Sequence, residues 1–286
     1  MTNPELNRGD KGEAVVRLQD DLNKVGAMLK PDGDFGSGTE RGVRYAQDIA
    51  GQPVTGSAEE NIRYWLDDKP EPYPLLDTNG IAFIAREETG GLSFYQRVTR
   101  WPHYPGVQSG ITIGVGYDLR FNTLDNFREL WEPHLPAEAI SELAKDIGKK
   151  GTKTRASQLK QIGIEVLFKA AWPVFIEQTL PRFYEYTEGI YSSLPRLPQL
   201  CRSVLVSIVF NRGSKLTGSS RQEMRKIRDI LAAADDMSLH KAKRKMILSD
   251  VEDEILSMQR LWEPSSGLIK RRQSEANLWR TGLNNW

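Results

Sequence analysis

The sequence is poor in the residues that build disulfides and metal sites. Its 286 residues include a single cysteine, Cys201, so an intramolecular disulfide is excluded. Cys201 sits beside the apolar run 204–210, where we expect a buried and unreactive thiol. The three histidines, His103, His134 and His240, are scattered without the spacing of metal ligands. We therefore expect no cofactor, no metal site and no catalytic triad.

The sequence also lacks an excess of charge of either sign and a long apolar run. The chain has 39 basic and 38 acidic residues, a net charge of +1, so no global basic field points to nucleic acid. The local basic surface comprises Arg221, Arg225, Lys226, Arg228, Lys241, Lys243, Arg244 and Lys245. We expect it to be a solvated helix face, because it lacks the interleaved aromatic residues that a nucleic-acid partner needs. No run reaches membrane-spanning length and residues 1–8 contain no apolar signal core, so we expect neither membrane insertion nor a signal peptide.

One helical stripe ends in a glutamate. The spacing i, i+3, i+4 and i+7 places four residues on one helix face: Ile81, Ile84, Ala85 and Glu88. Glu88 thus continues an apolar stripe, whereas Glu87 faces elsewhere, and residues 89–91, Thr-Gly-Gly, are typical of a helix stop. The negative end of the helix dipole and partial burial disfavour the ionised carboxylate, a property that a general acid needs at neutral pH. The alternative is an ordinary solvated glutamate at a helix end.

A glycine-rich segment follows this helix. Residues Thr112–Tyr117 alternate β-branched residues with glycines, which is typical of a short strand or hairpin that other groups approach closely. A dinucleotide-binding loop is excluded, because the third glycine and the following helix are missing. In an extended chain even offsets share a face, so we expect Thr112 and Asp118 to project into one cleft unless a bulge at the glycines breaks the alternation. Together with Glu88, Asp118 supplies the two carboxylates that glycosidic cleavage requires.

The stretch from Glu88 to Leu119 resembles the phage-type lysozyme superfamily, and within it the pesticin-like lysozyme domain. The matching positions are Glu88, Tyr95, Pro105-Gly106, Ser109-Gly110 and Thr112–Leu119. In that branch a glutamate at a helix end, a threonine opening the strand and an aspartate after Gly-Tyr form the catalytic trio. The resemblance implies these roles for Glu88, Thr112 and Asp118. Many phage lysozymes place the aspartate between the other two; residues 88–112 contain none, which favours Asp118.

Two later stretches resemble the same superfamily. Residues 204–213 resemble its long buried helix ended by glycine, and residues 267–275 resemble the C-terminal helix that packs back on the site. We expect Arg271 and Arg272 to lie on a solvated helix face. Aromatic faces suit sugar rings, although core packing claims most aromatic residues. The candidates for substrate contact are Tyr95, Ser109, Tyr117 and Asn211.

The N-terminal residues have the pattern of a small three-helix module. Apolar spacing predicts helices after Gly12, over 39–49 and over 58–66, with Thr39 and Ser57 as caps of the second and third. The pattern resembles the common three-helix peptidoglycan-binding domain, which implies that the module binds bacterial peptidoglycan. The matching positions include Leu6, Arg8, Gly9, Val15, Leu18, Gln19, Leu22, Gly26, Asp32-Gly33, Phe35-Gly36, Val43, Gln47 and Val54-Thr55-Gly56. The alternative is a purely structural cap.

Three prolines within residues 67–74 interrupt the chain after this module. We therefore divide the chain into a peptidoglycan-binding domain at 1–68, a linker at 69–76 and a lysozyme-like catalytic domain at 77–286. The expected fold class is α+β and predominantly helical, with a small β region in the catalytic domain.

These patterns predict a muramidase that hydrolyses the β-1,4 bond between N-acetylmuramic acid and N-acetylglucosamine. Glu88 is the expected general acid, Asp118 and Thr112 are expected to activate water, and the resemblance favours inversion. The alternatives are a lytic transglycosylase giving 1,6-anhydro products and a non-catalytic wall-binding or phage-tail protein. We expect a monomer, made in the bacterial cytoplasm, that reaches periplasmic peptidoglycan by holin release or injection. A holin, a secretion machine and an immunity protein are the further candidate partners.

Overall fold

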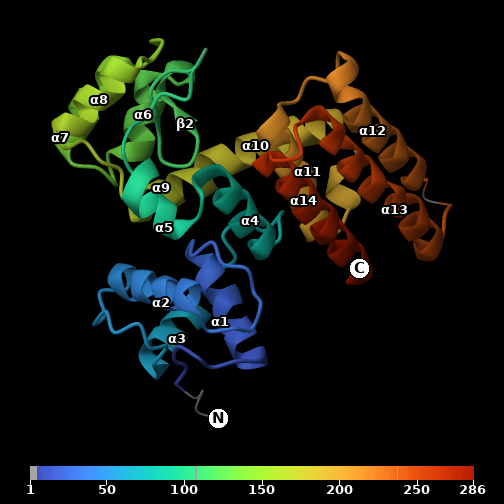
Figure 1. The fold of residues 1–286 in the computed structure, drawn as a ribbon, viewed down its shortest axis with the longest axis horizontal. Coiled ribbons are helices and arrows are strands. Elements are labelled where there is room, and N and C mark those ends of the chain that lie inside the picture. The colour runs from blue at the N-terminus through green and yellow to red at the C-terminus, as the bar shows by residue number, and fades with distance from the viewer. Residues whose placement is uncertain (1–4, 107, 237) are drawn as a thin grey trace. The chain divides into compact units, whose positions relative to one another are not determined.

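The structure, a computed structural model, describes residues 5–106, 108–236 and 238–286. Residues 1–4, on which the expectation about a signal peptide partly rests, lie outside these ranges. The chain divides into two compact units, residues 1–72 with 85–180 and residues 73–84 with 181–286. Helix α4 (Thr78–Thr89) therefore belongs partly to each unit (Figure 1). The predicted linker at 69–76 contains the first of these boundaries, whereas residues 77–286, expected to form one domain, are shared between the units.

The N-terminal module contains the three predicted helices: α1 (Glu13–Lys24), α2 (Ser37–Ile49) and α3 (Glu60–Asp67). Each helix has an apolar stripe that faces the other two. The stripes and the flanking loops form one buried core of Leu6, Val15, Leu18, Leu22, Val25, Ala27, Phe35, Val43, Ala46, Ala58, Ile62 and Leu66. The three helices predicted from hydrophobic periodicity are therefore confirmed.

The two predicted capping residues are wrong. Helix α2 has Gly36 at its N-cap, so Thr39 lies inside the helix. The Thr39 hydroxyl is buried and accepts a hydrogen bond from Gln19 Nε2 at 3.0 Å. Helix α3 has Glu59 at its N-cap, without a side-chain capping bond, so Ser57 does not cap it. In both cases the helix starts at a residue other than the one that the sequence pattern favoured.

Two buried glutamines join the loops of this module to its helices. Gln19 donates to Asp32 Oδ1 at 2.9 Å and accepts from the Gly33 amide at 2.9 Å. Gln47 accepts from the Gly56 amide at 2.9 Å. Buried amides are costly when they lack partners, so these bonds give each glutamine a structural role in the motif.

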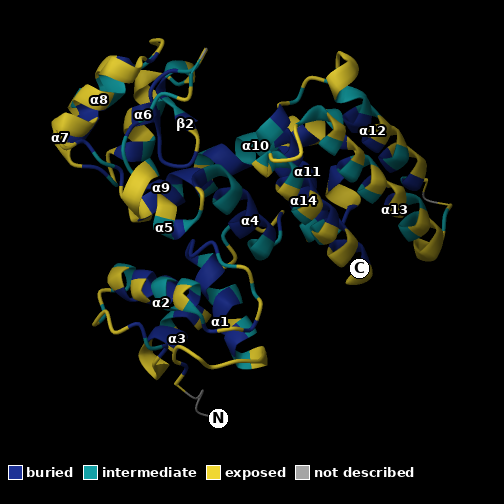
Figure 2. Cartoon of the chain, in the orientation of Figure 1, coloured by how far each residue is buried: buried dark blue, intermediate teal, exposed yellow. Residues whose placement is uncertain are grey.

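The remainder of the first unit places short helices around a two-stranded hairpin. Strand β1 (Thr112–Ile113) pairs antiparallel with β2 (Tyr117–Asp118). The helical elements after α4 are α5 (Leu92–Phe94), η1 (Tyr95–Thr99), η2 (Leu119–Phe121), α6 (Leu124–Trp131), α7 (Ala137–Leu143), η3 (Ala144–Asp146), α8 (Lys153–Gln161), α9 (Phe168–Val174) and η4 (Phe175–Thr179). Helix α8 is largely exposed and contributes Leu159 to the interior (Figure 2).

The second unit is entirely helical in its described residues. After the first part of α4 it contains α10 (Leu180–Ile190), η5 (Leu194–Arg196), α11 (Gln199–Arg212), η6 (Ser219–Arg221), α12 (Gln222–Ala234), α13 (Lys241–Ser257), η7 (Met258–Leu261) and α14 (Gly267–Asn284). Helix α11 is buried over residues 203–209 and stops at Gly213, whose φ of 74° is left-handed. The predicted helices at 204–213 and 267–275 are thus confirmed as parts of α11 and α14. Cys201 is buried as predicted, and burial raises the pKa of its thiol.

The prediction that Arg271 and Arg272 form a solvated face is wrong. Their side chains are 4 % and 0 % exposed, and both pair with Glu275, which is 0 % exposed. Arg271 also donates to the Ser207 hydroxyl at 3.0 Å. Two adjacent arginines are usually solvated, but a glutamate three and four residues further along the same helix lies within reach of both.

The predominantly helical class is confirmed. In the described ranges, no helix combines the length and apolarity needed to cross a membrane. The same ranges contain no group of three or more histidine, cysteine, aspartate or glutamate side chains arranged to hold a metal ion.

Helix α4 and helix α9 both contact the N-terminal module. Arg86 Nη1 donates to the Met28 carbonyl at 3.3 Å, and Thr89 Oγ1 contacts Met28 Sδ at 3.3 Å. Gly26 has a φ of +94° and packs against Trp172; a Cβ built on Gly26 would lie 2.7 Å from Trp172 Cδ2. Only a glycine fits this position without moving the indole ring.

We expect Gly26→Ala to destabilise the protein more than an ordinary left-handed glycine substitution. The backbone strain costs about 1–2 kcal/mol, and overpacking against Trp172 adds about 1–3 kcal/mol. Gly9→Ala is the matched control, because Gly9 has a φ of +104° with nothing within 4 Å of its Cβ position. Chemical denaturation of both variants measures the difference, and equal losses would contradict the packing argument.

Candidate active site

Glu88 lies on the helix face that the apolar spacing predicts. The residues one and two turns earlier on this face, Ile81, Ile84 and Ala85, are each 0 % exposed, and Glu88 itself is half-buried in the last turn of α4. Gly90 and Gly91 follow with φ of 78° and 83°, which ends the helix. The prediction of a helix-end glutamate on a buried stripe is confirmed.

Thr112 and Asp118 lie directly opposite each other across the hairpin. The register pairs Thr112 with Asp118 and Ile113 with Tyr117. The intervening turn contains Gly114 and Gly116 with φ of 56° and 74°, values that favour glycine. Opposed residues in an antiparallel pair project to the same face. The two side chains therefore share a face as predicted, although the cause is strand pairing and not alternation along one extended strand.

Backbone amides fix the orientation of the Asp118 carboxylate. The Gly110 amide donates to Oδ1 at 2.9 Å and to Oδ2 at 3.0 Å, and the Arg120 amide donates to Oδ1 at 2.9 Å. A Cβ on Gly110 would lie 2.5 Å from Asp118 Oδ1. A Cβ on Gly151 would lie 2.6 Å from the Gly110 carbonyl carbon. Two glycines thus allow three segments of backbone to approach closely around one carboxylate.

Thr112 occupies the centre of a row of three residues. It also forms an antiparallel bridge with His103, through His103 N to Thr112 O at 3.0 Å and Thr112 N to His103 O at 2.8 Å. The side chains of His103, Thr112 and Asp118 accordingly lie on one face of this small sheet. Thr112 is 5 % exposed, and its hydroxyl is buried without a hydrogen-bond partner among the described residues. A donor and acceptor hydroxyl is therefore held beside an oriented carboxylate.

Sequence reasoning missed His103. Its spacing from the other histidines excludes a metal site, and nothing in its local sequence indicates a bridge to a strand that begins nine residues later. Burial lowers the pKa of His103 below its ordinary value of 6.5, while the Trp101 carbonyl and the charge of Asp118 oppose that shift. The imidazole next to Thr112 is therefore neutral at pH 7.

Two predicted substrate contacts belong to the core. Tyr95 is 0 % exposed, and its hydroxyl donates to the Val166 carbonyl at 3.0 Å. Tyr117 is 4 % exposed; its ring packs edge-on against Trp131, and its hydroxyl donates to Asn126 Oδ1 at 3.2 Å. Neither tyrosine presents a ring face on which a sugar can stack.

The other two predicted contacts lie in different units. Ser109 is half-buried beside Gly110, and its carbonyl accepts from the Gly151 amide at 3.0 Å. Asn211 is on α11 in the second unit, where its Oδ1 accepts from Arg272 Nη2 at 3.2 Å. Ser109 is thus part of the backbone cradle of Asp118, and Asn211 is tied to the buried cluster around Glu275.

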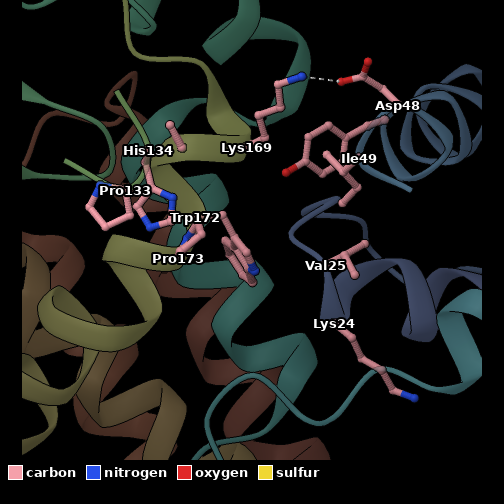
Figure 3. Close-up of a pocket in the computed structure, with 11 residues that line it drawn as sticks. Lys24, Val25, Asp48, Ile49, Pro133, His134, Lys169, Trp172 and Pro173 are labelled. Atoms are coloured by element: carbon pink, nitrogen blue, oxygen red, sulfur yellow. Dashed lines mark hydrogen bonds and ion pairs between the residues drawn. The ribbon is translucent and has the colours of Figure 1, made fainter. Parts of the chain in front are cut away.

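Two hollows in the first unit lie apart from this row. One hollow, of about 520 Å³, is lined by residues of α1, α2 and α9 together with Pro133 and His134 (Figure 3). An ion pair between Lys169 and Asp48, at 3.1 Å, joins two of its lining residues. The other, of about 430 Å³, shares His134 and Lys169 with the first. Glu88, Thr112 and Asp118 line neither hollow. Asp48 is paired with Lys169 in the first hollow. Two glutamates line the second hollow, Glu138 and Glu165, and Glu165 pairs with Arg100 at 3.3 Å.

Two family models match parts of the chain. Residues 11–66 match the family described as "Putative peptidoglycan binding domain". Residues 82–170 match the family described as "Domain of unknown function (DUF8812)". No curated protein matches the chain. The first match supports a peptidoglycan-binding domain at the N-terminus and hence association with the bacterial cell wall; the second contains Glu88, Thr112 and Asp118 but does not support the predicted lysozyme-like domain.

The lowered pKa of His103 leads to a prediction for stability. The folded protein binds fewer protons at this imidazole than the unfolded chain, so its contribution to stability is present above pH 6.5 and is lost as the pH falls through the folded pKa. We expect His103→Gln to flatten the decrease of Tm between about pH 7 and about pH 5. Thermal melts across this range measure the slope. Identical slopes for the wild type and the variant would show that His103 does not titrate as inferred.

Proposed function

We propose that the protein is a peptidoglycan muramidase that hydrolyses the β-1,4 bond between N-acetylmuramic acid and N-acetylglucosamine. The N-terminal domain binds the wall, and the residues that follow α4 cleave it. Under this proposal the protein acts on periplasmic peptidoglycan after holin release or injection.

The observation that carries the proposal is the pairing of Thr112 with Asp118. A buried hydroxyl without a partner costs stability, and a fold under selection for stability alone has no reason to keep it beside a carboxylate. The carboxylate in turn is held by three bonds from the backbone amides of Gly110 and Arg120, so it does not need to reorganise during a reaction. A purely wall-binding protein does not require the unpartnered hydroxyl.

The proposed mechanism assigns one proton transfer to each carboxyl group. Glu88 donates a proton to the glycosidic oxygen as the bond to the anomeric carbon breaks. Asp118 accepts a proton from a water molecule whose oxygen bonds to that carbon from the opposite face, and the Thr112 hydroxyl orients this water. The anomeric configuration is inverted. This geometry requires the two carboxyl groups to be about 6.5–9.5 Å apart.

We expect Glu88→Gln to abolish wall hydrolysis. The amide cannot donate the proton that the leaving oxygen needs, so turnover should fall by about 10²–10⁴-fold. Glu87→Gln is the matched control, because Glu87 is the adjacent glutamate of the same helix turn and lies off the stripe. Loss of turbidity of permeabilised cells measures the rate. Full activity in Glu88→Gln with loss in Glu87→Gln would overturn the assignment.

The masses of the products distinguish hydrolysis from transglycosylation. Hydrolysis adds water to the cleaved bond, whereas a lytic transglycosylase leaves 1,6-anhydro ends and needs no second carboxylate. Mass spectrometry of digested sacculi should therefore show reducing ends. Anhydro ends would replace the muramidase proposal with the transglycosylase, and intact sacculi would favour a binding protein.

We expect Thr112→Val to separate catalysis from stability. Its hydroxyl has no partner to lose, so Tm should stay constant or rise, while kcat falls by about tenfold or more, which corresponds to roughly 1.4 kcal/mol of the barrier. Thr112→Ser should show the opposite pattern, with kcat retained and Tm lowered. It keeps the hydroxyl and the activity, but loses a buried methyl group worth about 0.8 kcal/mol. Steady-state kinetics and thermal melts of both variants provide the test, and parallel losses of activity and stability would indicate a structural threonine.

A further inference from the structure

Arg212 is a buried cation at the end of α11 in the second unit. It is the last residue of the helix before Gly213, and its side chain is 9 % exposed. Its Nη2 donates to the Ser220 carbonyl, and its Nε is buried without a hydrogen-bond partner among the described residues. The favourable interaction of a cation with a helix C-terminus does not neutralise a buried charge.

Two arginines near Arg212 are paired with glutamates, whereas Arg212 has no such pair among the described residues. Arg272 pairs with Glu275 at 2.9 Å, and Arg260 pairs with Glu223 at 2.6 Å. Among the described residues, no carboxylate lies within 4.0 Å of the Arg212 guanidinium. Buried charges in folded proteins are normally paired, so an unpaired one indicates that its partner is a ligand.

The charges around Arg212 make the binding of an anion there more favourable. Burial and then the positive charges of Arg221 and Arg272 lower the pKa of Arg212 to about 10, with Glu223 opposing the shift. Arg221 donates to the Arg212 carbonyl, which holds a second guanidinium close by. The local field therefore favours a negative group beside Arg212.

The Trp262 ring lies beside two of these arginines. The half-buried indole lies 5.3 Å from the Arg212 guanidinium carbon and 5.7 Å from that of Arg272. These cation–π contacts orient both guanidinium groups but bring no negative charge. A planar guanidinium matches the geometry of the two oxygens of a carboxylate.

We propose that Arg212, Arg221 and Trp262 form a binding site for a carboxylate of peptidoglycan, supplied by the stem peptide. The choice of peptidoglycan as the source of the carboxylate rests on the proposed function; the need for an oxyanion rests on the unpaired arginine. A wall polymer that carries phosphate offers related chemistry and is separated from peptidoglycan by the experiment.

The test measures binding of a soluble disaccharide tetrapeptide to the full chain carrying Glu88→Gln, which prevents turnover. We expect Arg212→Met to weaken binding by about tenfold or more, and to have no effect on the same muropeptide after its carboxyl groups are converted to amides. The indole N–H of Trp262, assigned in NMR spectra through Trp262→Phe, should shift only with the native muropeptide. Arg228→Met is the control, because Arg228 is exposed and pairs with Asp229 at 2.8 Å.

The stability of the ligand-free protein provides the second readout. Arg212→Met removes an uncompensated buried charge, so its Tm should equal or exceed that of the parent, and the rise in Tm caused by the muropeptide should disappear. A lower Tm without ligand, unchanged affinity, or equal weakening for native and amidated muropeptides would overturn the site. Glycerol phosphate shifting the Trp262 signal where the muropeptide does not would assign the site to phosphate. Sacculi left intact by the wild-type protein would refute the proposed function while leaving the Arg212 measurements valid.

Discussion

The close approach of backbone at Gly110 is the constraint on which the candidate site depends. Its amide reaches both oxygens of Asp118 because no side chain separates the two segments, and Gly151 makes room for Gly110 from the other side. This contact fixes the second strand of a very short hairpin. The hairpin in turn sets Thr112 opposite Asp118, and the bridge to His103 extends the row by one residue. Two residues per strand would not hold such a register alone.

The structure treats its buried polar groups in two ways. Gln19, Gln47 and Glu275 have hydrogen-bonding partners that offset the cost of burial. The Thr112 hydroxyl and the Arg212 Nε do not. Replacing a buried polar group that lacks a partner by an apolar group of similar shape is expected to stabilise the fold. Each unit thereby contains a polar position that stability alone does not explain.

Periodicity predicted the parts of the fold that one face of a helix determines. The helices of the N-terminal module, the stripe ending at Glu88 and the buried run of α11 all follow from apolar spacing and a terminal glycine or turn. The failures involve contacts that spacing does not encode. The sequence allows Tyr95 to be either a surface for sugar stacking or a core residue, because aromatic rings suit both. Its hydrogen bond to the Val166 carbonyl is a tertiary contact that identifies it as a core residue.

Charge and register were the other limits of prediction. Arg271 and Arg272 looked solvated because adjacent arginines usually are, yet Glu275 on the same helix allowed both to be buried. His103 joined the row through a bridge that depends on a loop path, which no local pattern reports. The arrangement of side chains in the candidate site therefore depends on tertiary contacts, whereas the elements that carry it follow from the sequence.

The two crowded glycines also restrict how this sequence can evolve. A methyl group at position 110 would meet the aspartate oxygen at 2.5 Å, and one at position 151 would meet the neighbouring main chain at 2.6 Å. Neither clash can be relieved by turning a flexible side chain, since backbone atoms stand in the way. Lineages that retain the aspartate in its present orientation are expected to keep both glycines, whereas the exposed positions of helix α8 are less constrained.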